Sequence, residues 1–355
     1  MSSPHDSVLD ALLYPFAEGL LHWPQAAPVL FLRGREGAAL HGLPHAALVA
    51  TQSFKPEAAR LERIGITLLD EEALPAHHYP LVLVLPPRQR EEARALLAKA
   101  CRAVAADGVV VAAVSNDEGA KSREADLKHL AGNVSTLSKY HCRVFWTRPQ
   151  AAWEAAHIAQ WAQADAPRRQ PCAELPAGAF HTRPGVFAWD RVDAASRMLA
   201  NVLPATLRGR VADLGAGWGY LSMQVLARCP HVTALDVYEA DARALALAQR
   251  NLADARVPVH CHWQDVERGV SERFDAIVCN PPFHALGRGD RPDIGRAFIA
   301  AASAALKSGG RLWLVANRHL PYEDALGSGF AQVRSVAQDG GFKIIEAVKA
   351  GGARA

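Results

Sequence analysis

The stretch VADLGAGWG, residues 211–219, decides the fold of this 355-residue chain. It joins an apolar run typical of a buried strand, residues 210–214, to a segment with the apolar spacing of a helix. Gly215, Gly217 and Gly219 allow the backbone to turn tightly and to approach a ligand closely, because glycine has no Cβ atom. A strand, a glycine-rich turn and a helix in this order predict a doubly wound α/β sheet with a ligand at its carboxyl edge.

The residues around this turn indicate which ligand it would hold. A dinucleotide-binding GxGxxG sequence would need its third glycine at Tyr220, so that pattern is not met. Asp213 instead places a carboxylate just before the turn, which suits an ammonium or sulfonium charge better than a pyrophosphate. Asp236 is predicted to end the next strand, 17 residues after Gly219, where a carboxylate can bind both hydroxyls of a ribose. Asp265 is predicted to end the following strand, where it either accepts a hydrogen bond from an adenine amine or caps a helix.

A second chemical signal is Asn280-Pro281-Pro282-Phe283, which directly follows the apolar run FDAIVC. Two consecutive prolines fix the backbone and remove local N–H groups that would compete for its carbonyls. The Asn280 side-chain oxygen and the Pro281 carbonyl can both accept hydrogen bonds from one planar NH2 group, which aims its nitrogen lone pair at an electrophile. Phe283 can stack on the ring that carries the amine. The alternative is that the prolines only form a rigid strand exit.

The first half of the chain contains a weaker copy of the same pattern. YPLVLVLPP at 79–87 and DGVVVAAVSN at 107–116 frame an Ala-rich helical segment, as FDAIVCNPP at 274–282 and GGRLWLVAN at 309–317 do in the second half. Both segments are an apolar strand ending in Pro-Pro, a helix, a glycine turn and a strand ending before Asn. The parallel favours an internal duplication of one fold over a chance likeness of two α/β sheets.

The duplication predicts two Rossmann-like, doubly wound domains in tandem, with a seven-stranded sheet in the second. The first copy has Leu85 in the place of Asn280 and lacks a glycine-rich turn with an acidic partner. We therefore expect residues 1–150 to form a degenerate domain without a cofactor site, residues 151–178 to form a connector, and residues 179–355 to form the catalytic domain.

Composition limits the class of protein further. Half of the residues are hydrophobic and 21% are charged, which is typical of a globular chain, and the net charge of +3 is compatible with a nucleic-acid partner without requiring one. The six cysteines are scattered without CxxC pairs, which argues for a reducing cytoplasm and against a zinc site, so we expect no metal. The sequence predicts neither a secretory signal nor a membrane span.

These motifs resemble those of the class I S-adenosylmethionine-dependent methyltransferases that modify amino nitrogens. Further segments resemble the ribosomal RNA guanine-N2 methyltransferases: FHTRPGVF at 180–187, Asp193, Met198-Leu199, NPPFH at 280–284, Ala316-Asn317, Leu320-Pro321-Tyr322 and Gly341-Phe342-Lys343. In that family the N-terminal half is itself a degenerate methyltransferase domain, which agrees with the duplication. First-half features resemble the small-subunit branch: Leu85-Pro86-Pro87, Asn116 and Lys139-Tyr140-His141-Cys142. The sequence departs from the family pattern at the bulky Trp218 and Tyr220, and at Ala188, where Ser is expected.

The resemblance implies methyl transfer from S-adenosyl-L-methionine to the exocyclic N2 of a guanine in 16S ribosomal RNA. The cofactor would be held by Asp213, Gly215, Gly217, Asp236 and Asp265, and the base by Asn280, Pro281 and Phe283. A basic loop with His284, Arg288, Arg291 and Arg296 either binds nucleotide phosphates or is an ordinary solvated loop. His284 is not needed as a general base, because the amine proton can leave to solvent after attack. The expected partner is ribosomal RNA or the assembling small subunit, bound by a cytoplasmic monomer.

Other functions remain open at this point. The acceptor could be a guanine N2 in 23S ribosomal RNA, or an adenine N6 or protein glutamine amide, since NPP followed by Phe or Tyr serves those acceptors too. A non-catalytic RNA-binding or ribosome-assembly scaffold is a different class of function. The intact DxGxGxG and NPPF sequences argue against the scaffold.

Overall fold

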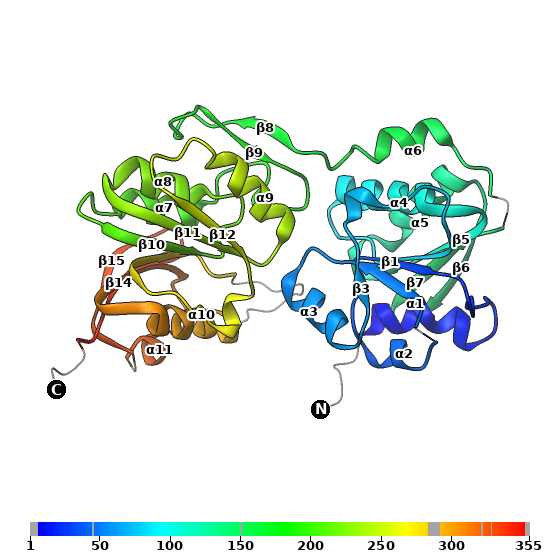
Figure 1. The fold of residues 1–355 in the computed structure, drawn as a ribbon, viewed down its shortest axis with the longest axis horizontal. Helices are drawn as coiled ribbons and strands as arrows, with labels where there is room; N and C mark the ends of the chain where they lie inside the picture. Colours follow the sequence, from blue (N-terminus) through cyan, green and yellow to red (C-terminus); the bar gives the residue numbers. More distant parts are fainter. Residues whose placement is uncertain are drawn as a thin grey trace. The chain divides into compact units, whose positions relative to one another are not determined.

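A computed structural model describes residues 6–44, 46–149, 151–282, 292–320, 322–327 and 329–351 (Figure 1). The chain forms two compact units, Met1–Ala166 and Pro167–Ala355. The segment 151–178 is shared between them instead of forming a separate connector. Helix α6 (Ala155–Trp161) packs on α4 (Arg90–Ala103) of the first unit, and β8 (Arg168–Pro171) pairs with β9 (Ala179–Thr182) in the second.

The first unit is built on a sheet with the strand order β3-β2-β1-β4-β5-β7-β6. Its strands are β1 (Val29–Leu32), β2 (Leu48–Thr51), β3 (Thr67–Leu68), β4 (Tyr79–Val84), β5 (Val104–Ser115), β6 (Val134–Lys139) and β7 (Cys142–Thr147). Its other helices are α1 (Ser7–Ala17), α2 (Ala38–His41), α3 (Lys55–Arg63) and α5 (Ala120–Ala131), with the short 3-10 helices η1 (Glu71–Ala73) and η2 (Asn116–Glu118). The first five strands in this order run parallel, and β7 runs antiparallel to both of its neighbours.

The second unit is built on a sheet with the order β12-β11-β10-β13-β14-β16-β15. Its strands are β10 (Arg208–Leu214), β11 (His231–Glu239), β12 (Val259–Trp263), β13 (Phe274–Cys279), β14 (Leu306–Asn317), β15 (Phe330–Asp339) and β16 (Phe342–Lys349). Its helices are α7 (Ala194–Val202), α8 (Tyr220–Arg228), α9 (Ala242–Asn251), α10 (Pro292–Ala305) and α11 (Glu323–Gly327), with the 3-10 helix η3 (Val266–Arg268).

The two strand orders are identical, each strand of the second sheet taking the place of the strand nine positions earlier in the chain. The predicted tandem of Rossmann-like domains is therefore confirmed, and the first sheet also has seven strands. The register of the central strands also places individual residues of the two sheets in equivalent positions. Leu32 pairs with Val84 between β1 and β4, and Leu214 pairs with Cys279 between β10 and β13. The next residues, Leu85 and Asn280, consequently occupy equivalent places, as the sequence predicts.

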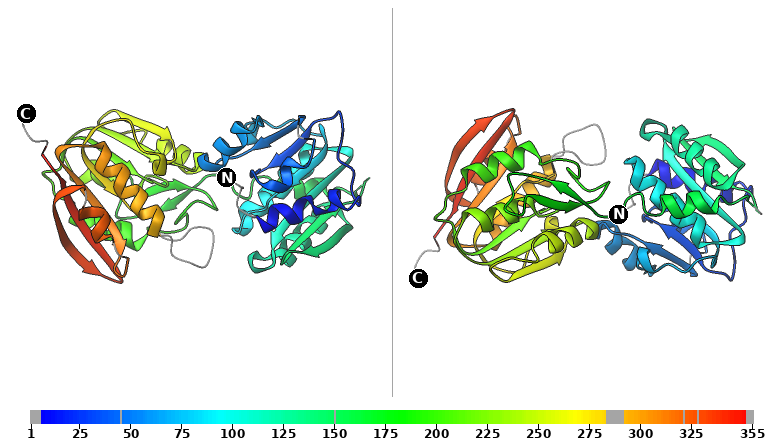
Figure 2. Two further views of the ribbon diagram at one scale, coloured as in Figure 1. Left: turned by 90° about the horizontal axis from the view of Figure 1, so that it is seen from below. Right: turned by 90° about the horizontal axis from the view of Figure 1, so that it is seen from above.

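Alternating side chains explain why the second sheet is covered on both faces. In β10, Val211 belongs to the apolar cluster with α7, α8 and α9, whereas Leu214 belongs to the cluster with α10 and α11. Figure 2 shows these two layers: α10 lies over the sheet in the view from below, and α7, α8 and α9 lie over it in the view from above. A parallel sheet buried in this way leaves the carboxyl ends of its strands as the edge available for a ligand.

Across the described ranges, no helix combines the length and the apolar character that a membrane crossing requires.

Candidate functional site

The glycine-rich turn lies at the carboxyl end of β10 and leads directly into α8. Gly215 and Gly217 adopt left-handed backbone conformations with φ of +76° and +56°, which side chains with a Cβ disfavour. The amides of Gly215 and Ala216 donate to the Tyr238 carbonyl at 2.9 and 3.1 Å, which ties the turn to the end of β11. The predicted turn is therefore formed between two neighbouring parallel strands.

Asp213 lies beneath this turn and is fully buried. Its Oδ2 accepts a hydrogen bond from Ser222 Oγ at 2.7 Å, whereas its buried Oδ1 has no hydrogen-bond partner among the described residues. Burial raises the pKa of Asp213 to about 7, although the hydrogen bonds from Ser222 act in the opposite direction. A buried carboxylate oxygen without a donor is suited to a positively charged donor on a ligand.

Asp236 does not end its strand, and this expectation was wrong. Strand β11 continues for three residues to Glu239, and Asp236 pairs in register with Ala212 inside the sheet. Its side chain is fully buried. The carboxylate accepts hydrogen bonds from Nε and a terminal nitrogen of Arg210, both at 2.7 Å, and from His262 Nε2 at 2.9 Å. These contacts occupy the carboxylate within β10, β11 and β12, so it is not open to ribose hydroxyls.

Glu239 holds the position that Asp236 was expected to hold, and the sequence reasoning missed it. Its Oε2 accepts the Gly217 amide at 2.7 Å, and its Oε1 accepts the Asp241 amide at 2.8 Å. Burial raises the pKa of Glu239 above its usual value, and these backbone hydrogen bonds only partly oppose that effect. The missed signal is the apolar pair Val237-Tyr238, which extends the strand beyond Asp236.

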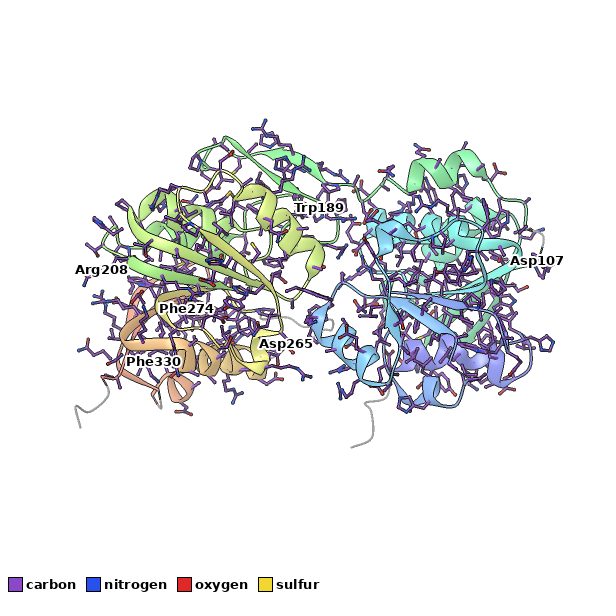
Figure 3. All side chains as sticks on the ribbon, viewed as in Figure 1. Asp107, Trp189, Arg208, Asp265, Phe274 and Phe330 are labelled. Atoms are coloured by element: carbon purple, nitrogen blue, oxygen red, sulfur yellow. The ribbon has the colours of Figure 1, made fainter. Side chains whose placement is uncertain are left out.

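Asp265, labelled in Figure 3, adopts the helix-capping alternative. Its Oδ1 accepts the Glu267 amide at 3.1 Å and begins η3, while its Oδ2 lies 3.3 Å from Arg268 Nε. This side chain follows β12 at the same edge of the sheet as the glycine turn.

Asn280 follows β13 and shares one pocket with the glycine turn. The pocket is lined by Phe187, Ala188, Asp193, Ser196, Gly215, Ala216, Gly217, Trp218, Tyr220, Leu221 and Asn280. Asn280 Nδ2 donates to Asp193 Oδ2 at 3.0 Å and to Ser196 Oγ at 2.8 Å. The structure therefore brings Gly215, Gly217 and Asn280 together, as the sequence predicts.

The remaining predicted substrate contacts are only partly described. Pro281 is buried. Arg296 lies on α10, where its Nε donates to the Pro292 carbonyl at 3.3 Å. The other predicted contacts lie outside the described residues: Phe283, His284, Arg288 and Arg291.

The bulky residues at the turn contact side chains and backbone that precede α7 in the chain. Trp218 stacks on Phe180 with ring centroids 3.9 Å apart, and its Nε1 donates to the Ala188 carbonyl at 3.3 Å. Tyr220 donates its hydroxyl to Glu174 at 3.0 Å. These contacts account for the departures at Trp218 and Tyr220, because both rings join the turn to the segment preceding α7.

A larger hollow of about 340 Å³ lies between α9 and β12, lined by residues including Gln249, Leu252 and Cys261. It shares no lining residue with the pocket at Asn280. We take the smaller pocket as the functional site, because only it combines the glycine turn with polar groups that can act on a ligand. Within the described part of the chain, no cluster of three His, Cys, Asp or Glu side chains could hold a metal ion.

Comparisons with known proteins find similarity along nearly the whole chain. The family described as Methyltransferase small domain matches residues 177–346. Ribosomal RNA large subunit methyltransferase G of Aeromonas salmonicida is 30% identical, over 97% of this chain and 92% of that protein. Ribosomal RNA small subunit methyltransferase C of Shewanella loihica is 30% identical, over 75% of this chain and 76% of that protein. A T. thermophilus 16S rRNA N2 methyltransferase, solved with AdoMet and guanosine, has the same fold: the TM-score is 0.81 at 24% identity, over 98% of this chain and 93% of that one.

Proposed function

The chain belongs to the family of ribosomal RNA methyltransferases, which take their methyl group from S-adenosylmethionine, and we propose that it methylates the exocyclic N2 of a guanine in small-subunit ribosomal RNA. The observation that carries this proposal is the hydrogen bonding of Asn280. Its Nδ2 is bound to Asp193 and Ser196, which leaves its Oδ1 as the acceptor available at the pocket that contains the glycine turn. An acceptor at that position suits an exocyclic amine.

Two features of the second unit fit S-adenosylmethionine. The donor-free Oδ1 of Asp213 suits the ammonium of its amino-acid end, and Glu239, hydrogen bonded to the turn at Gly217, suits its ribose hydroxyls. In this proposal Glu239 takes the role first expected of Asp236. Asp265 remains a proposed contact of the adenine amine, because capping η3 leaves further lone pairs on its carboxylate.

The chain's own residues would act mainly by positioning. Asn280 Oδ1 and the Pro281 carbonyl would accept the two N–H groups of the target amine and aim its lone pair. When bound, S-adenosylmethionine supplies the electrophilic methyl group. The proton would leave to solvent, so no side chain need act as a base. Phe283 stacking, and phosphate contacts of His284, Arg288 and Arg291, remain part of the proposal.

Large-subunit ribosomal RNA is the second candidate substrate. The observation that favours it is the relative from A. salmonicida, a large-subunit methyltransferase that aligns over 97% of this chain. The two candidates share the same chemistry and differ in the RNA that is bound.

Mass-spectrometric mapping of N2-methylguanine in both ribosomal RNAs from a deletion strain tests the proposal. We expect one modification to be lost from 16S RNA and restored by the wild-type gene but not by Asn280→Ala. A loss confined to 23S RNA would support the second candidate. Unchanged N2-methylguanine in both RNAs would refute the function. Purified protein on undermethylated naked RNA and on assembled subunits would then identify the form of the substrate.

A further inference from the structure

The side chains behind Asn280 carry an inference that rests on the proposed function. We propose that Asp193 and Ser196 are positioning residues that hold the Asn280 carboxamide with its oxygen toward the target amine. A carboxamide has two nearly isosteric ends, of which one only accepts hydrogen bonds and the other only donates them. Rotation by half a turn would replace the acceptor at the pocket with a donor. The reaction therefore needs a reason for Asn280 to keep one orientation.

Asp193 supplies that reason, because its carboxylate can only accept. Asn280 Nδ2 lies 3.0 Å from Asp193 Oδ2, and the opposite rotation would set Oδ1 against this oxygen. Ser196 Oγ accepts from the same Nδ2 at 2.8 Å, so each of the two N–H bonds has its own acceptor. The orientation follows from the chemistry of the partners, which is the firm basis for assigning an amide.

The anchor is rigid because it is also the start of a helix. Asp193 Oδ2 accepts the Ser196 amide at 2.8 Å and thereby caps α7. Ser196 lies in the first turn of that helix and is buried. One carboxylate oxygen thus fixes both the helix and Asn280, although Asp193 and Asn280 are 87 residues apart in the chain.

A pair of substitutions can remove the anchor and keep the helix cap. Asp193→Ser retains a good capping oxygen but has a shorter side chain, which withdraws the acceptor from Asn280. Ser196→Ala removes the second acceptor. We expect the double variant to lower single-turnover methylation of undermethylated ribosomal RNA by roughly 10- to 100-fold, while affinity for S-adenosylhomocysteine changes by less than about threefold. Asp193→Asn is the matched control, since its amide oxygen can accept both hydrogen bonds, and its rate should stay within about threefold of wild type.

A double-mutant cycle tests whether these residues act through Asn280. In an Asn280→Ala background, Asp193→Ser with Ser196→Ala should lower the rate no further, because the group that they position is gone. A further loss of the same size as in the wild-type background would overturn the proposal and assign both residues a purely structural role.

The two proposals fail in different ways. Wild-type protein that transfers no methyl group to guanine N2 in either ribosomal RNA would refute the proposed function, and the positioning role would fall with it. An active wild type that keeps its full rate after Asp193→Ser with Ser196→Ala would refute the positioning role alone.

Discussion

Strands β1 and β10 hold the same place in their sheets, and each is followed by a residue with a left-handed backbone, Arg33 at φ +54° and Gly215 at φ +76°. In the second unit this position is part of an open turn. In the first unit a long cationic side chain stands there instead. The two positions share a left-handed backbone conformation, but only the first unit has a side chain there that can occupy the space of a ligand.

The Arg33 side chain enters a network of ion pairs at the carboxyl edge of the first sheet. Arg33 contacts Glu71 at 3.2 Å and Glu92 at 3.1 Å, and Lys99 contacts Glu71 at 3.0 Å. Burial raises the pKa of Glu71, but Arg33 and Lys99 outweigh it and hold the value at about 2. Charged side chains of the first unit therefore fill the edge where the second unit has its glycine turn. We propose that these side chains leave residues 1–150 without a cofactor site.

Gln52, directly after β2, and Glu239, at the end of β11, occupy equivalent positions, and their hydrogen bonds also differ between the two units. Gln52 and Glu239 each accept the backbone amide two residues further on, Phe54 at 2.9 Å and Asp241 at 2.8 Å. Gln52 then donates Nε2 to the Gly34 carbonyl, whereas Glu239 accepts the Gly217 amide. The comparison teaches that a binding edge can be closed by a few side chains without any change in strand order.

Exchanging Gly215 for its first-unit counterpart should have the largest effect. Gly215→Arg places a long side chain in the turn, and its Cβ would lie 3.2 Å from the Phe298 ring. We expect affinity for S-adenosylhomocysteine to fall by about 1000-fold or more, about 4 kcal/mol, with the circular dichroism of a folded protein. Arg33→Gly is the matched control and should leave cofactor affinity unchanged. Wild-type affinity of Gly215→Arg by calorimetry would place the cofactor elsewhere.

Asn280→Leu, which copies Leu85, should chiefly affect turnover. Removing the acceptor for the target amine should slow single-turnover methylation by about 100-fold or more, about 3 kcal/mol, with cofactor affinity close to wild type. The reverse change, Leu85→Asn, should add no activity and should lower stability, because Leu85 is buried. Parallel losses of rate and cofactor affinity in Asn280→Leu would indicate a structural role for Asn280.

Glu239→Gln, which copies Gln52, should have a smaller effect that is confined to the cofactor. Loss of a charged acceptor for the ribose hydroxyls should weaken S-adenosylhomocysteine binding by about 30-fold, about 2 kcal/mol. Asp236→Asn is the control, and it should lower the thermal stability with little effect on cofactor affinity, because Asp236 pairs with Arg210 and His262. If calorimetry shows normal cofactor affinity for Glu239→Gln and weakened affinity for Asp236→Asn, Asp236 and not Glu239 would be the residue that binds the ribose.

Local sequence patterns predicted the fold well because they reflect local physics. The glycine turn, the Pro-Pro strand exits and the apolar runs are contiguous, and they were enough to predict both sheets and the equivalence of Leu85 with Asn280. The strand end at Asp236 was misplaced because an acidic residue can remain inside a sheet when its partners neutralise it. Arg210 and His262, which do so, lie on neighbouring strands and not beside it in sequence.

The contacts that complete the site are the ones that sequence patterns could not supply. Asp193 and Ser196 reach Asn280 across more than 80 residues, and no spacing rule connects them. The closure of the first sheet likewise depends on where Arg33, Glu71 and Lys99 meet in space. Sequence motifs indicated the chemistry, and the structure was needed to show which side chains contact Asn280 and which side chains fill the edge of the first sheet.

Asp213 offers the finest test of the comparison, because its first-unit counterpart is the fully buried, apolar Phe31. Burial raises the pKa of Asp213 from 3.8 to about 7, so the ionised form opposes folding. This opposition is absent below the unfolded-state value and grows as the pH rises from about 4 through 7. Asp213→Asn should therefore raise the unfolding free energy by about 1–2 kcal/mol at pH 8, and by less than half as much at pH 5. The gain at pH 8 is smaller than the pKa shift alone would give, because the new amide N–H has no hydrogen-bond acceptor.

The same substitution should weaken S-adenosylhomocysteine binding at pH 8, because it puts an N–H donor where the ligand's ammonium needs an acceptor. Thermal unfolding at pH 5 and pH 8, with calorimetry at pH 8, measures both effects. Glu71→Gln in the first unit is the contrasting control. The pKa of Glu71 is lowered, so its stabilising contribution is present above about pH 4.5 and is lost as the pH falls toward 2, and the variant should be less stable at pH 8. An Asp213→Asn protein that is destabilised at pH 8, or that binds the cofactor normally, would contradict the view that the second unit keeps a buried acid for its ligand where the first unit keeps an apolar core.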